Sequence, residues 1–130
     1  MTYYVKKKWT TAKKSNYGGY TYDSGFEANY ARELDLRVKA KDIKSYEKQK
    51  TLELIVNGYL VCTYRIDFIV YHNDKTIEYV ETKGVAFPVW RIKFKLFEAL
   101  YGDKENVKIT VVQQGNNPRW RVPKPRRIKK

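Results

Sequence analysis

Three charged residues lie in segments whose pattern is otherwise that of buried strands. Asp67 interrupts the apolar and aromatic run "YRIDFIVY". Glu81 and Lys83 lie at the end of a second such run, "IEYVETKG". Residues two apart in an extended chain point to the same side, so Glu81 and Lys83 share one face of their strand. Two carboxylates beside an ammonium group have the composition of a site that binds a divalent metal ion or moves a proton.

The turn between these two strands predicts that Asp67 and Glu81 are neighbours. A three-residue turn at 73–75 pairs position 67 with position 81, which brings their β-carbons to about 5 Å on one face. Repulsion between the two carboxylates is then about 3–4 kcal/mol at an effective dielectric near 20. The pair therefore needs a shared proton or a cation. Either a divalent ion supplies it, or Lys83 does, and in the second case the three residues are only a salt bridge.

Periodicity and end signals predict the elements that position these residues. "SGFE" at 24–27 is a capping box, Asn57-Gly58 is a strong hairpin signal, and Pro88 and Gly102 mark the start and end of a second helix. The expected elements are a helix over 24–40, strands over 46–56, 59–71 and 76–83, a helix over 88–101 and a strand over 107–112. The predicted fold class is α/β, in the order αβββαβ, with a mixed sheet built from a three-strand meander and a further strand.

Two details of this pattern concern the surroundings of the site. The two-residue turn at Asn57-Gly58 pairs position 48 with position 67, so Lys48 rather than Gln49 is expected opposite Asp67. In the second helix, helical spacing favours burial of an aliphatic stripe formed by Val89, Ile92, Leu96 and Leu100. An aromatic stripe on the same helix, formed by Trp90, Phe94 and Tyr101, then serves a subunit interface or ordinary core packing.

The positive charge is concentrated at the two ends of the chain. The net charge is +13; five basic residues in 1–22 and seven in 119–130 make up 12 of the 27, and neither segment contains an acid. Tyr and Trp lie among these cations, a combination that suits contact with phosphates and bases, although solubilising tails are the alternative. We therefore expect a basic, Tyr-rich N-terminal arm at 1–22 of irregular structure, a core domain at 23–113, a basic tail at 114–130, and nucleic acid as the partner.

The residues expected to contact nucleic acid are all basic. Lys93 falls near the apolar stripe of the second helix, where it either meets a phosphate near the site or snorkels to an edge. The other residues come from the arm and the tail. The full set is Lys6, Lys7, Lys8, Lys13, Lys14, Lys93, Arg119, Arg121, Lys124, Arg126 and Arg127.

Several classes of protein are excluded by what the chain lacks. Cys62 is the only cysteine and His72 the only histidine, which rules out an intrachain disulfide, a cysteine zinc cluster and histidine-based hydrolase motifs. The start has no signal-peptide pattern, and no apolar run approaches the roughly 20 residues needed to cross a bilayer. We expect a cytoplasmic protein that has no membrane partner and no small-molecule cofactor.

"RIDF" followed by "VETKG" resembles the signature of the PD-(D/E)xK nuclease superfamily, in which an aspartate lies across a hairpin from a Glu-Thr-Lys run, here residues 81–83. Ile66 occupies the position of the proline in the motif's name, a position that varies in the superfamily. The order of the expected elements over about residues 23–113 resembles its restriction-endonuclease-like core. The small size, the basic ends and "YDSGFEANYARELDL" resemble small phage-encoded endonucleases, among them Holliday-junction resolvases.

The resemblance implies roles for five groups. Asp67, Glu81 and the main-chain carbonyl of Thr82 would bind Mg²⁺ or Mn²⁺. Lys83 would orient or help deprotonate the attacking water and stabilise charge on the phosphate. Glu27 would reach the site from the first helix, to orient a water or bind a second metal. The same glutamate also occupies the capping-box position after Ser24, which is its alternative role.

The function implied is that of a metal-dependent endodeoxyribonuclease, structure-specific on branched DNA such as Holliday junctions, in recombination, repair or phage DNA processing. Cutting two opposed strands calls for a homodimer. A repair or restriction-type nuclease acting on duplex DNA is the alternative within the same class. A nucleic-acid-binding protein without catalysis is the alternative from another class. The resemblance also implies a bacterial protein, or a phage-encoded one that acts in the host cell.

Overall fold

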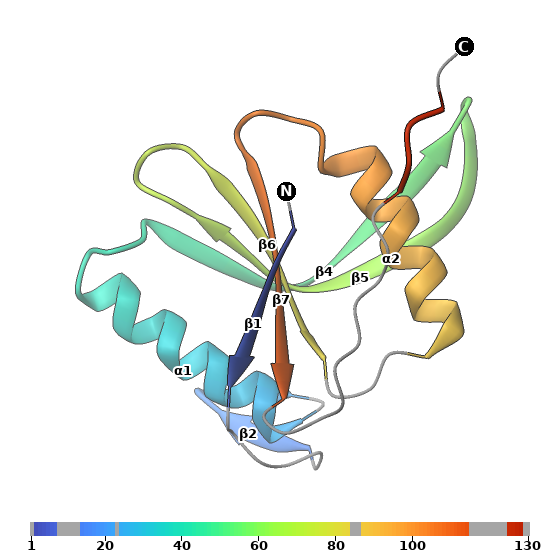
Figure 1. Ribbon diagram of the computed structural model, residues 1–130. Helices are drawn as coiled ribbons and strands as arrows, with labels where there is room; N and C mark the ends of the chain where they lie inside the picture. The colour runs from blue at the N-terminus through green and yellow to red at the C-terminus, as the bar shows by residue number, and fades with distance from the viewer. Residues whose placement is uncertain (1, 8–13, 23, 84–86, 115–124, 129–130) are drawn as a thin grey trace.

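A computed structural model describes most of the chain as a mixed sheet with two helices and a separate hairpin (Figure 1). It describes residues 2–7, 14–22, 24–83, 87–114 and 125–128, without the side chains of Lys7, Ser15, Lys83 and Gln114. In chain order the elements are β1 (Thr2–Lys7), β2 (Ser15–Tyr17), β3 (Tyr20–Tyr22), α1 (Gly25–Lys39), β4 (Ser45–Val56), β5 (Tyr59–Tyr71), β6 (Ile77–Lys83), α2 (Pro88–Tyr101) and β7 (Val107–Gln114).

The main sheet has five strands in the order β1-β7-β6-β5-β4. β4, β5 and β6 form an antiparallel meander, whereas β7 runs parallel to both of its neighbours, β6 and β1. Parallel neighbours need a long crossover connection, and α2 provides it between β6 and β7. The predicted α/β class and mixed sheet are therefore confirmed.

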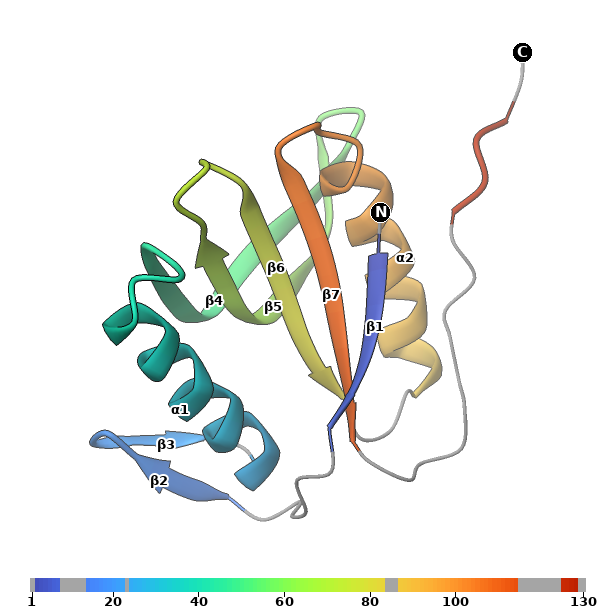
Figure 2. The same cartoon turned by 60° about the vertical axis from the view of Figure 1, so that its left-hand side comes forward.

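The two helices pack against opposite faces of this sheet (Figure 2). What we call the α1 cluster consists of Tyr22, Phe26, Ala28, Tyr30, Ala31, Leu34, Ile43, Phe68, Val70, Val80 and Val112. What we call the α2 cluster consists of Leu54, Tyr64, Ile66, Ile69, Trp90, Phe94, Phe97, Ile109 and Val111. Successive residues of β7, Val111 and Val112, belong to different clusters, as the alternation of side chains along a strand requires.

The alternation changes phase in the middle of β5. Ile66 belongs to the α2 cluster and Phe68 to the α1 cluster although they are two residues apart, and Ile69 belongs to the α2 cluster again. Asp67 lies at this change of face. On the neighbouring strand β4, Gln49 has a φ of 52°, and Tyr46 packs against the α1 cluster while Leu52 packs against the α2 cluster. Both strands therefore depart from regular alternation at the same level of the sheet.

The first helix begins at the predicted position. The hydroxyl oxygen of Ser24 accepts a hydrogen bond from the main-chain N–H of Glu27 at 3.1 Å, which is the capping-box contact expected from "SGFE". Ala31 and Leu34 are fully buried on the same side of the helix as Glu27, which is 8% exposed. These three residues therefore form the inward stripe of α1, which faces the sheet.

The N-terminal segment is not the irregular arm that the sequence predicts. Residues 2–7 form β1, which pairs with β7, and residues 15–22 form a hairpin whose turn consists of Gly18 and Gly19, at φ 60° and 77°. Positive φ values are accessible to glycine without steric cost, so this pair permits the tight turn. The prediction failed for β1 because its only partner strand begins about a hundred positions later in the chain, and no local pattern reports such a pairing.

The predicted aliphatic stripe of α2 is also wrong in part. Val89 and Ile92 are 67% and 70% exposed, whereas Trp90, Phe94 and Phe97 are buried in the α2 cluster. Aromatic side chains bury more area than aliphatic ones, so the helix turns its aromatic side to the sheet. Leu96 and Leu100 pack at the border of this cluster. Among the described residues, no helix is both long and apolar enough to cross a membrane.

This orientation of α2 predicts opposite results for two substitutions on the same helix. Phe94→Ala should lower the free energy of unfolding by about 3–5 kcal/mol, because it removes a fully buried ring. Ile92→Ala should change it by less than about 0.5 kcal/mol, because that side chain is exposed. Urea unfolding followed by circular dichroism measures both values. Equal losses for the two variants would contradict the assigned orientation.

Candidate active site

The β5–β6 pairing has the register that the sequence predicts. Phe68 pairs with Val80 and Tyr71 with Ile77, and the N–H of His72 donates to the carbonyl of Thr76 at 2.9 Å across the turn. Extending this register by one residue places Asp67 opposite Glu81. The recorded ladder stops one pair earlier, at Phe68 and Val80.

The ladder stops there because the side chain of Asp67 replaces a main-chain acceptor. Oδ2 of Asp67 accepts a hydrogen bond from the main-chain N–H of Thr82 at 2.8 Å and another from its hydroxyl at 2.8 Å. The N–H of Thr82 is therefore directed toward β5, and it meets a carboxylate where a regular ladder has a carbonyl. The carboxylate of Asp67 thus lies in the gap between β5 and β6. The β5–β6 ladder is therefore irregular at Asp67, where the sequence predicts a regular hairpin. The placement of Asp67 and Glu81 on one face stays a prediction.

Hydrogen bonds that start from α2 hold the side chain of Glu81. It is 4% exposed, and its Oε2 accepts a hydrogen bond from the phenol of Tyr64, whose oxygen in turn accepts one from Nε1 of Trp90 at 3.1 Å. Burial, followed by the negative charge of Glu81, raises the pKa of Tyr64 well above its usual value. Tyr64 is consequently a neutral hydrogen-bond donor at physiological pH. Glu81 is connected in this way to α2, through Trp90.

Glu27 is connected to β4 by a second relay. Nε2 of Gln49 donates to Oε2 of Glu27 at 3.0 Å, and the phenol of Tyr20 donates to Oε1 of Gln49 at 3.0 Å. The predicted candidate Glu27 therefore faces the sheet, as the inward stripe of α1 implies. Gln49 is a polar residue near Asp67 that the sequence does not predict there, because the expected register places Lys48 opposite Asp67.

The reason that Gln49 was missed is a β-bulge. Near the turn, Val56 pairs with Tyr59 as the Asn57-Gly58 signal predicts, but the register shifts by one residue between Leu54 and Ile55. Lys48 consequently pairs with Phe68 and Lys50 with Ile66, which leaves Gln49 opposite Asp67. The prediction that Lys48 is opposite Asp67 is wrong for this reason. The signal that was available is the alternation of Leu52, which is partly buried, with the buried residues Tyr64 and Ile66, and this alternation fits the shifted register.

The oxygen atoms near Asp67 are of the chemical kind that Mg²⁺ binds. A residue's N–H and C=O point to the same neighbouring strand, so the carbonyl of Thr82 is directed toward the gap that holds the Asp67 carboxylate. Carboxylate and carbonyl oxygens are the hard ligands that Mg²⁺ takes, typically one or two carboxylates with several waters retained. Within the described part of the chain, no group of three or more His, Cys, Asp or Glu side chains is arranged to hold a metal ion. The role of Glu27, as a residue that orients a water or as a ligand of a second metal, stays a prediction.

Lys83 is the last residue of β6 and pairs with Gln113 of β7. Its main chain therefore lies one residue beyond Thr82 at the same end of the sheet. Its side chain is outside the described atoms.

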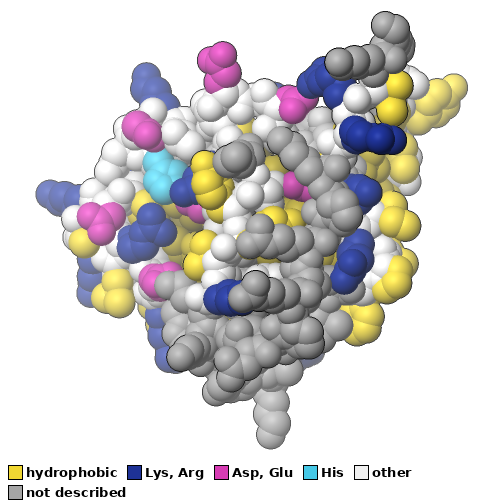
Figure 3. Space-filling model, in the orientation of Figure 1, with side chains coloured by type: hydrophobic (Ala, Val, Ile, Leu, Met, Phe, Trp, Pro, Cys, Tyr) yellow, Lys and Arg dark blue, Asp and Glu magenta, His cyan; other side chains and the backbone are white. Residues whose placement is uncertain are grey.

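The described basic residues among those predicted to contact DNA come from different parts of the fold. Lys6 and Lys14 are exposed at the N-terminal side, Lys93 is half-buried on α2, and Arg126 is exposed near the C-terminus. Arg127 forms an ion pair with Asp103 at 2.6 Å. Figure 3 shows Lys and Arg side chains on both the α1 side and the α2 side of one face. The side chain of Lys7 and the residues Lys8, Lys13, Arg119, Arg121 and Lys124 lie outside what is described.

The tyrosines of the β2–β3 hairpin belong to the fold. Tyr22 is 1% exposed within the α1 cluster, where it contacts Phe68. Lys48 Nζ lies 4.4 Å from the centre of the Tyr20 ring, and the guanidinium of Arg32 lies 5.0 Å from that of Tyr17. These cation–π contacts stabilise the hairpin against α1 and β4. The ring of Tyr22 is thus core rather than a surface for stacking bases.

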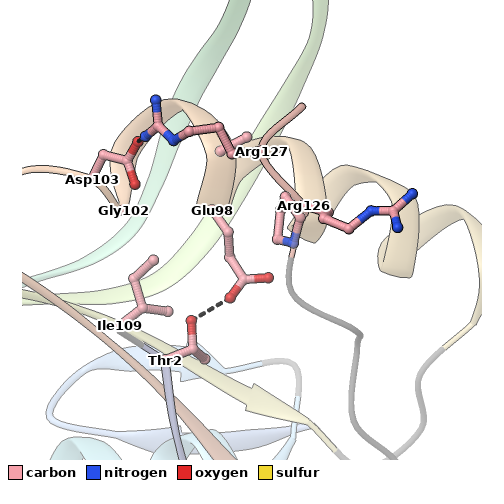
Figure 4. A pocket seen from close by; sticks show the side chains of 9 residues that line it. Thr2, Glu98, Gly102, Asp103, Ile109, Arg126 and Arg127 are labelled. Atoms are coloured by element: carbon pink, nitrogen blue, oxygen red, sulfur yellow. Dashed lines mark hydrogen bonds and ion pairs between the residues drawn. The ribbon is translucent and has the colours of Figure 1, made fainter. Parts of the chain in front are cut away.

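A cavity of about 530 Å³ lies away from these carboxylates, between the end of α2, the start of β1 and residues 125–127 (Figure 4). Thr2 donates a hydrogen bond to Glu98 inside it, while Arg127 reaches Asp103 at its rim and Arg126 points away. None of the residues that line it is among the predicted catalytic or metal-binding residues. Thr2 and residues 125–127 therefore line a cavity that is separate from the candidate site.

The chain belongs to the DUF1064 family. The family model, described as "Protein of unknown function (DUF1064)", matches residues 6–115. This span contains the β2–β3 hairpin, both helices and every residue of the candidate site. No curated protein and no solved structure matches the chain.

The contact between Tyr64 and Glu81 predicts the effect of removing one oxygen atom. Tyr64→Phe should lower the free energy of unfolding by about 1–3 kcal/mol, because Glu81 loses a donor and the Trp90 N–H loses its acceptor inside the protein. Tyr59→Phe is the matched control, since Tyr59 is 76% exposed, and should leave stability unchanged. Denaturant titration measures both. A Tyr64→Phe protein as stable as the parent would show that this relay does not hold Glu81.

Proposed function

We propose that the protein is a metal-dependent endonuclease that hydrolyses DNA phosphodiesters. The observation that supports this proposal is the end of the β5–β6 ladder. There a carboxylate, Asp67, meets the main chain of the residue that directly follows a second carboxylate, Glu81, and a lysine comes next in the sequence. This is the arrangement that the resemblance to the PD-(D/E)xK superfamily requires. In the same proposal α1, the meander, α2 and β7 correspond to a restriction-endonuclease-like core.

The residues of the site divide the work of hydrolysis between them. Asp67, Glu81 and the carbonyl of Thr82 would hold Mg²⁺ or Mn²⁺, which when bound supplies charge stabilisation at the phosphate and a more acidic water. Lys83 orients or helps deprotonate the attacking water and stabilises charge that develops on the phosphate oxygens. Glu27, reached through Gln49, orients water from the α1 side.

Branched DNA is the substrate that we favour, with a homodimer as the active form. The net charge of +13 supports binding to the phosphate backbone through release of counterions. The sequence contains no helix-turn-helix or zinc-finger pattern for reading bases in a groove, so recognition by DNA shape is the simpler proposal. A junction with two opposed strands to cut then calls for two sites. The exposed side chains of Val89, Ile92 and Phe87 at α2 offer one apolar surface for the second subunit.

The decisive experiment compares cleavage by the parent with cleavage by a charge-neutral variant of the site. Asp67→Asn should lower the rate by at least about 100-fold, because it removes a ligand charge at the reacting phosphate, while DNA affinity is retained. Asp74→Asn, in the exposed β5–β6 turn, is the matched control and should cleave as the parent does. Four-way junction and linear duplex of the same sequence are incubated with Mg²⁺ and with chelator. Cleavage by Asp67→Asn at the parental rate would overturn the role of Asp67.

The same experiment separates the alternatives. Cleavage of the linear duplex at the same rate as the junction would favour a repair or restriction-type nuclease. Absence of any cleavage in Mg²⁺ or Mn²⁺, together with DNA binding that is the same in chelator, would favour a protein that binds nucleic acid without catalysis.

The basic tail predicts a change in salt dependence. Deleting residues 119–130 removes seven cations and should weaken DNA binding. The plot of log affinity against log salt should become flatter by about 0.9 for each phosphate that the tail no longer neutralises. Fluorescence anisotropy at several salt concentrations measures the slope. Lys75→Ala, which removes one exposed charge in the β5–β6 turn, is the control and should leave the slope near the parental value. An unchanged slope after the deletion would reduce the tail to a solubilising segment.

A further inference from the structure

We propose that Gln49 is a positioning residue of this site, and that its side-chain amide holds the Glu27 carboxylate on the side of Asp67 that faces β4. The inference rests on the proposed nuclease function and goes beyond the motif residues. Three independent features of the structure support it: the register of β4, the backbone conformation of Gln49, and the partners of its amide group.

The first feature is the register. The bulge between Leu54 and Ile55 shifts β4 by one residue relative to β5, and this shift brings Gln49 rather than Lys48 to the position opposite Asp67. Bulges re-aim side chains, and they are over-represented next to active sites. A residue with a neutral amide therefore occupies the place where an unshifted hairpin would have an ammonium group. An amide can donate to a carboxylate without adding a positive charge to a proposed metal site.

The second feature is the backbone of Gln49. Its φ of 52° lies in the left-handed region, which costs a residue with a β-carbon of order 1–3 kcal/mol. The other non-glycine residues with positive φ in the described ranges, Lys41, Asn57 and Lys75, lie in turns or bends between elements, whereas Gln49 lies inside β4. Such strain persists only where the surroundings over-determine it, and it clusters at functional sites.

The third feature is the set of hydrogen bonds on the amide. The phenol of Tyr20 donates to Oε1, and Nε2 donates to Oε2 of Glu27 at 3.0 Å. Because Nε2 can only donate, it fixes the position of the acceptor oxygen Oε2 of Glu27 and so orients the carboxylate. The β2–β3 hairpin is thus coupled to the site through Tyr20, whose ring lies under Lys48.

A purely structural role is the competing explanation, since Glu27 is 8% exposed and a buried carboxylate needs a donor. The two explanations differ in what Gln49→Gly does. Glycine adopts positive φ without strain, so the variant removes the amide and relieves the backbone at once. A structural role predicts a change in stability alone. A positioning role predicts that kcat falls while KM does not change.

The test uses the full chain, with cleavage of a four-way junction in Mg²⁺ as the activity. Gln49→Gly and Gln49→Met should each lower kcat by about 10-fold to 100-fold, the loss typical of a misplaced acid–base group, with KM unchanged. The affinity for Mn²⁺ alone, measured by calorimetry, should equal that of the parent, because the proposed role of Glu27 is to orient water and not to bind the metal held by Asp67 and Glu81. Asn57→Gly is the matched control: it has the same φ of 52°, lies at the hairpin tip, and should cleave as the parent does.

A double-mutant cycle with Glu27→Ala completes the test. If Gln49 acts through Glu27, then Gln49→Gly in the Glu27→Ala background produces no further loss of kcat. Additive losses, or parental kcat in Gln49→Gly, would overturn the inference while leaving the nuclease proposal intact. A loss of Mn²⁺ affinity equal to the loss of kcat would also overturn it, because Gln49 would then support the metal ligands. If the parent itself cleaves no DNA, the proposed function fails, and this result is distinct from the others.

Discussion

The hydrogen bonds from Thr82 to the Asp67 carboxylate are the contacts on which the candidate site depends. They end the β5–β6 ladder, direct the carbonyl of Thr82 toward the same gap, and stand at the level where β5 changes the face of its side chains. An unpaired main-chain N–H inside a protein costs about as much as a missing hydrogen bond, so a carboxylate at this point stabilises the opening of the strands. The opening separates two strands without leaving the N–H of Thr82 unsatisfied.

Each helix reaches this opening through one polar relay. From the α2 side, Trp90 and Tyr64 hold Glu81; from the α1 side, Gln49 holds Glu27. Both relays consist of neutral hydrogen-bond donors, and both end on a carboxylate. The first relay starts at Trp90, which belongs to the α2 cluster, and the second starts at Tyr20, which packs against the α1 cluster. Packing of the helices and orientation of the acidic groups are therefore parts of the same structure, which is how a small domain holds charged residues at low exposure.

Local signals were enough to predict most of the fold and the motif residues. The Ser24 cap, the Asn57-Gly58 turn, Pro88 and Gly102 act within a few residues of the chain, and the elements they bound are found within two residues of the expected limits. The predictions that were wrong concern features that depend on contacts between distant segments of the chain. β1 requires β7, the bulge that shifts Lys48 and Gln49 requires the packing of Leu52 against Tyr64, and the side of α2 that is buried depends on the area its rings cover. No periodicity over a short window contains that information.

The parallel pairing of β1 with β7 has a consequence for how the protein is made. Thr2 is aligned with Ile109 in the finished sheet, so β1 leaves the ribosome well before β7 and cannot pair until β7 has been synthesised. Closing so long a loop is slow, because the entropy of the intervening chain is lost before the contact forms. The meander and α1 can form before β7 is synthesised, and β6 then offers the edge with which β7 pairs. Synthesis of β7 is therefore the event that completes the domain, and a nascent chain cut short before it carries an unfinished sheet.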